Sequence, residues 1–267
     1  HPNIVHCYDV VKTAKEIFII MEYCDSGDLM TIIKRPIKEK YAQFYFCQLA
    51  NGLKYLDVHN IIHRDIKPKN ILLTNKRRVL KLADFGLAKK IGDITLHETI
   101  CGSPLYMAPE IMSEKSYNNQ TDLWSIGMIL FEMLYGIHPF EQCKSVPELK
   151  NKIKKIEIQI PPENTQNKEV SDLCIGLLKK LLQKKAVDRI KWEEFFNHSW
   201  VTGYKYDTGS NSNEQSDENE KYEKKLHSVS IGSLTDNSPI IKNVPKQLSK
   251  PISTASMPII RNTQKEA

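Results

Sequence analysis

Three short motifs in a fixed order constrain this chain more than any other feature. They read H-R-D-I-K-P-K-N at 63–70, D-F-G at 84–86 and A-P-E at 108–110. One acidic residue in a polar loop is usually just solvated, but three ordered motifs at these spacings are a specific signal. The chain is therefore expected to fold in a way that brings the three segments to one site.

In this order the motifs resemble those of the protein-kinase family, over roughly residues 1–202. The segments T-I-C-G-S-P-L-Y-M-A-P-E at 99–110, M-E-Y-C at 21–24 and S-G-D-L at 26–29 most resemble the autophagy-initiating ULK kinases. Calcium/calmodulin-dependent and AMP-activated kinases share much of the pattern. The resemblance implies an α+β, bilobal fold, present here mainly as the helical C-lobe with most of the N-lobe missing.

The resemblance also implies a serine/threonine kinase that uses ATP and Mg²⁺ and acts on Ser or Thr side chains of proteins. Phosphoryl transfer needs an acceptor hydroxyl placed in line and phosphate charge neutralised by metal. Asp65 would accept the proton of the acceptor, and Lys67 would reach the transferred phosphate as a point charge. Asn70 and Asp84 carry hard oxygen atoms that suit Mg²⁺.

Half of a nucleotide pocket follows from the same resemblance. Met21 would be the gatekeeper, and the Glu22 carbonyl and Cys24 N–H would bind the adenine edge. Asp28 stands where the family places a ribose-binding acid, and Leu72 would form the apolar floor under the base. Ordinary core packing is the alternative for Met21, Cys24 and Leu72.

A regulatory switch is implied in the activation segment, residues 84–110. A phosphate on Thr99 would add about −1.5 to −2 charges and order the segment against Arg64 and Lys89. An upstream kinase or trans-autophosphorylation would supply it. The alternative is that Thr99 is an ordinary loop threonine.

Other matching residues have scaffold roles in the family. Asp122 is expected to cap the backbone of the 63–70 loop from a buried helix, and Glu110 and Arg189 to form a buried ion pair. The Ser103 hydroxyl is placed to hydrogen-bond Lys67.

Substrate preference can be partly inferred from three other positions. Lys69 should repel a substrate arginine, Leu105 adds apolar surface, and Leu87 resembles kinases that prefer serine. These residues predict a serine-preferring kinase with apolar residues flanking the acceptor.

Hydrophobic patterns predict the local structure of the first 202 residues. Residues 10–21 read as a hairpin with a buried second strand, and two short strands are expected around a turn at 74–78. Helical spacing of apolar residues predicts helices over 41–56, 123–134 and 173–182, with the middle one buried nearly all round.

Composition divides the chain near residue 202. All eight Phe and three Trp precede it, and residues 203–267 are rich in Ser and Asn. Such a segment cannot bury enough apolar surface to offset the entropy of ordering. We expect an N-lobe remnant and hinge over 1–24, a C-lobe over 25–202 and a disordered tail over 203–267.

The 267 residues contain no G-x-G-x-x-G loop and no V-A-I-K-type lysine. Two readings follow: a fragment of an active kinase, favoured by the non-Met start and the intact Asp65, Asn70 and Asp84, or a natural non-catalytic scaffold. A nucleic-acid-binding module has little support, because 38 Lys and Arg are offset by 32 Asp and Glu and no basic motif with stacked aromatics is present.

Six cysteines without metal-binding or paired spacing predict reduced thiols in a cytoplasmic protein. The apolar runs are too short for a transmembrane segment.

Overall fold

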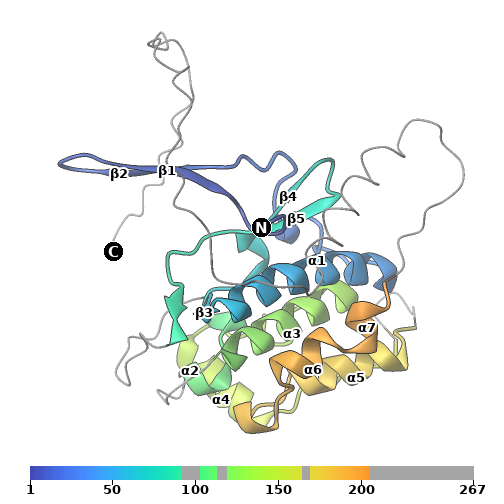
Figure 1. Ribbon diagram of the computed structural model, residues 1–267. Coiled ribbons are helices and arrows are strands. Elements are labelled where there is room, and N and C mark those ends of the chain that lie inside the picture. Colours follow the sequence, from blue (N-terminus) through green and yellow to red (C-terminus); the bar gives the residue numbers. More distant parts are fainter. Residues whose placement is uncertain (92–102, 113–118, 164–168, 205–267) are drawn as a thin grey trace, which may run out of the picture. The chain divides into compact units, whose positions relative to one another are not determined.

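A computed structural model describes residues 1–91, 103–112, 119–163 and 169–204 (Figure 1). The chain divides into two units, His1–Asp207 and Thr208–Ala267, and all described residues belong to the first. The tail expected over 203–267 lies outside the described residues from 205 onward. Its disorder and the domain boundaries therefore stay predictions.

Helices dominate the first unit, as expected for an α+β fold with a mainly helical body. They are α1 Glu39–Val58, α2 Pro109–Met112, α3 Gln120–Tyr135, α4 Val146–Lys155, α5 Asp172–Leu181, α6 Trp192–Phe196 and α7 Ser199–Thr202. The strands are β1 Cys7–Lys12, β2 Ile17–Met21, β3 Ile61–Ile62, β4 Ile71–Thr74, β5 Val79–Leu82 and β6 Lys89–Lys90. No described helix combines the length and the apolar character needed to cross a bilayer.

The core forms around α1 and α3, which pack against each other. Helix α3 is buried over nearly its whole circumference, which confirms the prediction for 123–134. On α1, the apolar residues at helical spacing all lie in the core: Ala42, Phe46, Leu49, Ala50, Leu53 and Leu56. Burial of such faces supplies most of the stability of helices in proteins, so these two helices form the platform for the loops above them.

Helix α3 ends at Gly136, whose backbone adopts a left-handed conformation with φ of +69°. A Cβ atom there would lie 2.4 Å from Cδ of Pro36. Both the conformation and the close approach require glycine at this position.

The strands pair as three antiparallel ribbons: β1 with β2, β3 with β6, and β4 with β5. The expected turn at 74–78 is present between β4 and β5, with Leu72 opposite Lys81 in register. Strand β5 is buried at every residue, including Lys81. The last two ribbons flank the 63–70 loop in sequence and fix its two ends.

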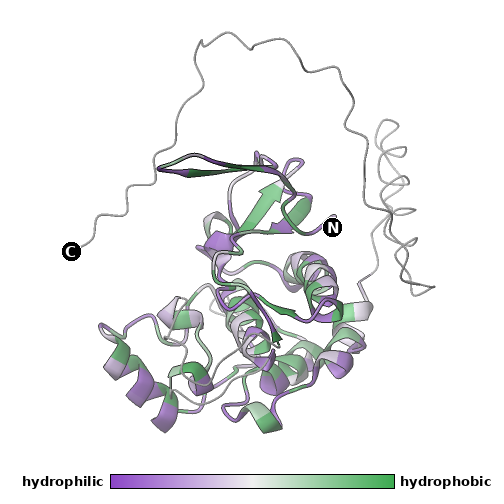
Figure 2. Cartoon of the chain, turned by 60° about the vertical axis from the view of Figure 1, so that its left-hand side comes forward, coloured by the Kyte–Doolittle hydropathy of each residue, from purple (hydrophilic) through white to green (hydrophobic). Residues whose placement is uncertain are grey.

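The hairpin prediction was right about the strands and wrong about burial. Residues of β2 are 47 to 63% exposed, and β1 is exposed throughout. Figure 2 shows that this hairpin carries hydrophobic residues. The apolar run at 17–21 predicts a buried strand, which is covered on both faces. In the described residues β1 and β2 form a sheet of only two strands, and a two-stranded sheet cannot bury its own faces.

The five cysteines in the described part of the chain are free thiols, as expected. Burial raises the pKa of the Cys47 thiol to about 12, so it stays protonated at neutral pH. Cys101 lies outside the described residues.

Candidate active site

The 63–70 loop is anchored from below by a buried carboxylate on α3. One oxygen of Asp122 accepts the backbone N–H of His63 at 2.8 Å, and the other accepts that of Arg64 at 3.0 Å. Burial raises the pKa of Asp122 and outweighs the opposing effects of His63 and these two amides. Arg64 has a φ of +67°, a conformation that a non-glycine residue keeps only when its surroundings hold it. Asp122 supplies that restraint.

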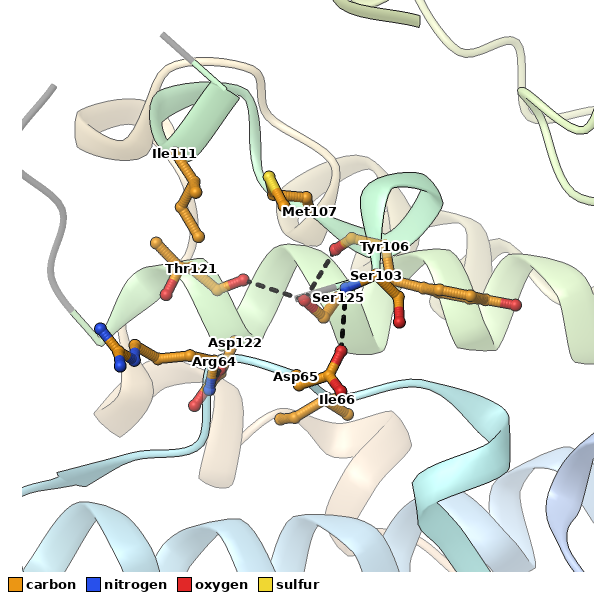
Figure 3. A pocket seen from close by; sticks show the side chains of 10 residues that line it. All are labelled: Arg64, Asp65, Ile66, Ser103, Tyr106, Met107, Ile111, Thr121, Asp122 and Ser125. Carbon is orange, nitrogen blue, oxygen red and sulfur yellow. Dashed lines mark hydrogen bonds between the residues drawn. The ribbon is translucent and has the colours of Figure 1, made fainter. Parts of the chain in front are cut away.

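Asp65, the expected proton acceptor, is 8% exposed and held by three donors. The Lys67 Nζ lies 2.5 Å from Oδ2, the Asn70 Nδ2 lies 3.1 Å from the same oxygen, and the Ser103 backbone N–H donates to Oδ1 at 2.9 Å. Figure 3 shows the hydrogen bond between Ser103 and Asp65. The sequence predicts a hydrogen bond between the Ser103 hydroxyl and Lys67, whereas in the described residues Ser103 contacts Asp65 through its backbone N–H.

The segment that carries Ser103 is itself fixed to α3. The Ser125 hydroxyl donates to the Tyr106 carbonyl at 2.8 Å (Figure 3). The Tyr106 hydroxyl donates to Glu132 at 2.7 Å, and burial raises the pKa of both groups. Helix α3 therefore holds the 63–70 loop through Asp122. It also holds the segment that carries Ser103, through Ser125 and Glu132.

Asp84 is brought beside the loop by two hydrogen bonds to its neighbour Ala83. The His63 Nε2 donates to the Ala83 carbonyl at 3.0 Å, and the Ala83 N–H donates to the Asn70 carbonyl at 2.8 Å. Asp84 itself is exposed, with φ of +62°, and accepts the Gly86 N–H at 3.3 Å. The expected metal ligands Asn70 and Asp84 are thus brought close together, because Asn70 bonds to the residue that precedes Asp84.

The donor set fits a hard cation. The Asn70 Nδ2 is used by Asp65, which leaves the amide oxygen as the atom able to ligate metal, and Asp84 exposes a carboxylate. The described residues contain no group of three or more His, Cys, Asp and Glu side chains that would hold a metal by themselves. A site built from one amide and one carboxylate matches Mg²⁺, which keeps water or substrate phosphate in its other positions.

The residues expected around a nucleotide base lie at the end of β2 and along β4. Asp28 forms a β-bridge with Leu72, and Leu72 faces away from the buried Ile71 and Leu73. Cys24 is partly exposed, and Met21 is 54% exposed at the end of β2. Asp28 and Leu72 are therefore adjacent in the backbone pairing, and their nucleotide-binding roles stay a prediction.

The Glu22 side chain has partners that the sequence did not suggest. Its Oε1 lies 2.8 Å from the Nζ of Lys81, and its Oε2 accepts the His6 N–H at 3.1 Å. Burial alone would raise the pKa of Glu22, but Lys81 and the His6 amide outweigh burial and lower it. The sequence does not single out Lys81, because a lysine between Leu80 and Leu82 is typical of the outward residue of a half-exposed strand.

The proposed regulatory cations converge on the start of the activation segment. The Arg64 Nε donates to the Leu87 carbonyl at 2.6 Å. Lys89 pairs with Ile62 across the β3–β6 ribbon, one residue from the loop. Thr99, the expected phosphorylation site, lies outside the described residues.

Glu110 and Arg189 form a bidentate ion pair. The Nη1–Oε1 distance is 2.7 Å and the Nη2–Oε2 distance is 3.0 Å. The guanidinium also donates to the carbonyls of Gln120 and Gln183 and lies over the Trp124 ring at 5.4 Å. This pair joins the end of the activation segment to the C-terminal helices.

Comparisons with known proteins identify the family of this chain. Residues 1–201 match the protein kinase domain. The serine/threonine-protein kinase atg1 of Dictyostelium discoideum is 44% identical over 208 residues, which cover 75% of this chain and 30% of that protein. ATG1c of Arabidopsis thaliana is 43% identical over 76% of this chain and 28% of its own length. ULK3 of Rattus norvegicus is 40% identical over 75% of this chain and 42% of its own length. The chain thus spans less than half the length of each of these relatives.

Proposed function

Because this chain belongs to the protein kinase family and is similar to serine/threonine kinases of the ATG1/ULK type, we propose that it transfers the γ-phosphate of ATP to Ser or Thr hydroxyls of proteins. The observation that carries the proposal is the Asp65 carboxylate, which three donors hold at the front of a loop anchored on α3. A carboxylate fixed in this way suits a residue that orients an acceptor hydroxyl and takes its proton.

Each loop residue has a separate part in the transfer. The oxygen of the acceptor forms a bond to the γ-phosphorus, the bond from that phosphorus to the leaving ADP oxygen breaks, and Asp65 takes the hydroxyl proton. Lys67, whose Nζ lies 2.5 Å from Asp65 Oδ2, would donate to the phosphate when substrate is present. Mg²⁺ held by Asn70 and Asp84 would neutralise phosphate charge.

The nucleotide would be held by backbone groups at the end of β2. The Glu22 carbonyl and the Cys24 N–H would bind the adenine edge, with Met21 beside them, Asp28 at the ribose and Leu72 under the base. Support comes from the Asp28–Leu72 bridge and from two bonds that join the 26–27 turn to Leu73.

The alternative is a non-catalytic scaffold, which the sequence itself keeps open. No glycine-rich loop or V-A-I-K-type lysine occurs in the 267 residues, so the α- and β-phosphates lack those donors within them. A charge-assisted hydrogen bond contributes about 1.5–3 kcal/mol, so several missing bonds would weaken nucleotide binding strongly.

A kinase assay on the chain, and on the chain together with any coding sequence found upstream of it, separates the two functions. We expect Asp65→Asn to reduce kcat by about 10²–10⁴, since general acid–base catalysis contributes that much. Asp84→Asn tests the metal role, and Asp172→Asn, an exposed acid at the start of α5, is the matched control. Equal phosphorylation by wild type and both active-site variants would favour the scaffold.

We further propose that phosphorylation of Thr99, by an upstream kinase or by a second copy, raises activity through Arg64 and Lys89. The position of both cations at the start of the activation segment supports this. Thr99→Ala should abolish activation by a phosphorylating kinase and leave basal activity in place. Full activation of that variant would contradict the proposal.

The free thiols fit a protein that works in the cytoplasm.

A further inference from the structure

Lys81 is a charged residue in the middle of a buried strand, and the proposed function does not use it. Its side chain is 10% exposed, and both neighbours on β5, Leu80 and Leu82, are fully buried. A lysine is rarely buried unless its charge is paired. Here the pair is with Glu22, the residue whose carbonyl is proposed to bind adenine.

Glu22 is held at three points. Its carboxylate contacts Lys81 through one oxygen and the His6 N–H through the other. Its own backbone N–H donates to the His6 carbonyl at 2.8 Å. The orientation of the Glu22 peptide group is therefore set from both the side chain and the backbone.

The segment that carries His6 is in turn bonded to β5. The Leu82 N–H donates to the Asn3 carbonyl at 2.8 Å, and the Val5 N–H donates to the Leu82 carbonyl at 2.9 Å. The Asn3 amide, 3% exposed, donates to the Leu80 carbonyl at 2.9 Å. Strand β5, residues 3–6 and Glu22 thus form a closed ring of contacts, in which the Lys81–Glu22 pair is the direct link.

The same strand leads to the catalytic groups. Asp84 follows Lys81 by three residues, and Ala83 between them is bonded to both His63 and Asn70. A shift of Glu22 relative to β5 would therefore be a shift of the adenine-binding backbone relative to the metal ligand and the 63–70 loop.

We propose that Lys81 and Glu22 are a positioning pair, which fixes the backbone that binds adenine in register with the catalytic loop. This inference rests on the proposed function. Stability alone is a poor explanation for the pair, because buried ion pairs often add little compared with apolar residues of similar size. The pair acts by orientation: it ties one specific peptide group to one specific strand.

Calorimetric titration of the full chain with adenosine tests this, since adenosine contacts the base pocket without needing phosphate donors. Lys81→Met and Glu22→Gln should each weaken adenosine binding about tenfold, which corresponds to 1.4 kcal/mol. Lys81→Arg should bind like wild type because it keeps the charge. The exchange of Lys81→Glu with Glu22→Lys should recover most of the affinity, as coupled residues do. Lys12→Met, an exposed lysine on β1, is the matched control.

The outcomes separate this inference from the proposed function. Wild type that binds adenosine, with single variants that bind equally well, overturns the positioning role and leaves the kinase proposal standing. Losses that neither Lys81→Arg nor the exchange recovers show a general packing defect and also overturn it. A wild-type chain that binds no adenosine overturns the base pocket of the proposed function, and the inference with it. If Lys81→Met fails to fold, Glu22→Gln and the exchange decide the matter. In an active chain, the variants should raise the KM for ATP more than they lower kcat.

Discussion

Replacing Glu110 with Gln would leave the guanidinium of Arg189 buried without its counter-charge. The Arg189 side chain is fully buried and that of Glu110 is 10% exposed, so solvent does little to screen the pair. The glutamine keeps the shape of the side chain and removes its charge. Arginine cannot relieve the imbalance by losing its proton, because a guanidinium stays protonated in proteins.

The size of the loss in stability follows from the contacts that the Arg189 guanidinium retains. It keeps its bonds to the carbonyls of Gln120 and Gln183 and its position over Trp124, so the fold should survive. Removing one partner of a buried pair typically costs about 3–5 kcal/mol. For a domain of about 200 residues each kcal/mol lowers Tm by about 2–4 °C, so Tm should fall by about 6–20 °C.

Urea unfolding of wild type, Glu110→Gln, Arg189→Met and the double variant measures this directly. We expect the midpoint to fall with the slope unchanged, because the surface exposed on unfolding is the same. The double variant should lose less than the sum of the single losses, since the second substitution removes a charge that the first had already left unpaired. A cost below 1 kcal/mol for both single variants, or strict additivity, would refute the reasoning.

Three further measurements address other parts of the fold. Gly136→Ala should destabilise by at least about 1–2 kcal/mol, because a left-handed alanine is strained and its Cβ would meet Pro36; thermal unfolding checks this, and an unchanged Tm would contradict it. His138 is 4% exposed, and burial lowers its pKa to about 4 from 6.5, so the folded state resists protonation. Stability should therefore fall as pH drops from about 6.5 to 4, by about 3 kcal/mol in total, and His138→Asn should remove that slope in unfolding titrations. The lowered pKa of Glu22 has the usual sign for a paired carboxylate: its stabilisation is present above its unfolded value of 4.5 and is lost as pH falls through the lower folded value. The stability difference between wild type and Glu22→Gln should thus be constant above pH 4.5 and shrink below it.

Local patterns predicted much of the fold because burial in this chain follows the helical period closely. The apolar face of α1 and the continuous apolar surface of α3 can each be buried well only as a helix, and both helices are found where expected. The burial of β2 could not be predicted in the same way. A run such as I-F-I-I-M specifies a strand, but what covers a strand depends on neighbours that are not encoded in the run.

The residues of the candidate site likewise fall into those that the sequence predicts and those that it does not. Asp65, Asn70, Asp84 and Asp122 could be predicted because they stand in sequence motifs that resemble those of protein kinases. The roles of Lys81 and of the Ser103 backbone N–H depend on register and on a contact across 38 residues of sequence. Lys81 is buried on β5, which pairs with β4 along one edge and bonds to residues 3–5 along the other. Its charge is stabilised there by the ion pair with Glu22, which follows β2 in a different ribbon. A residue whose function lies in joining two elements has no signature in either element alone, and for that reason the adenosine titration with exchanged charges tests a property that sequence patterns do not contain.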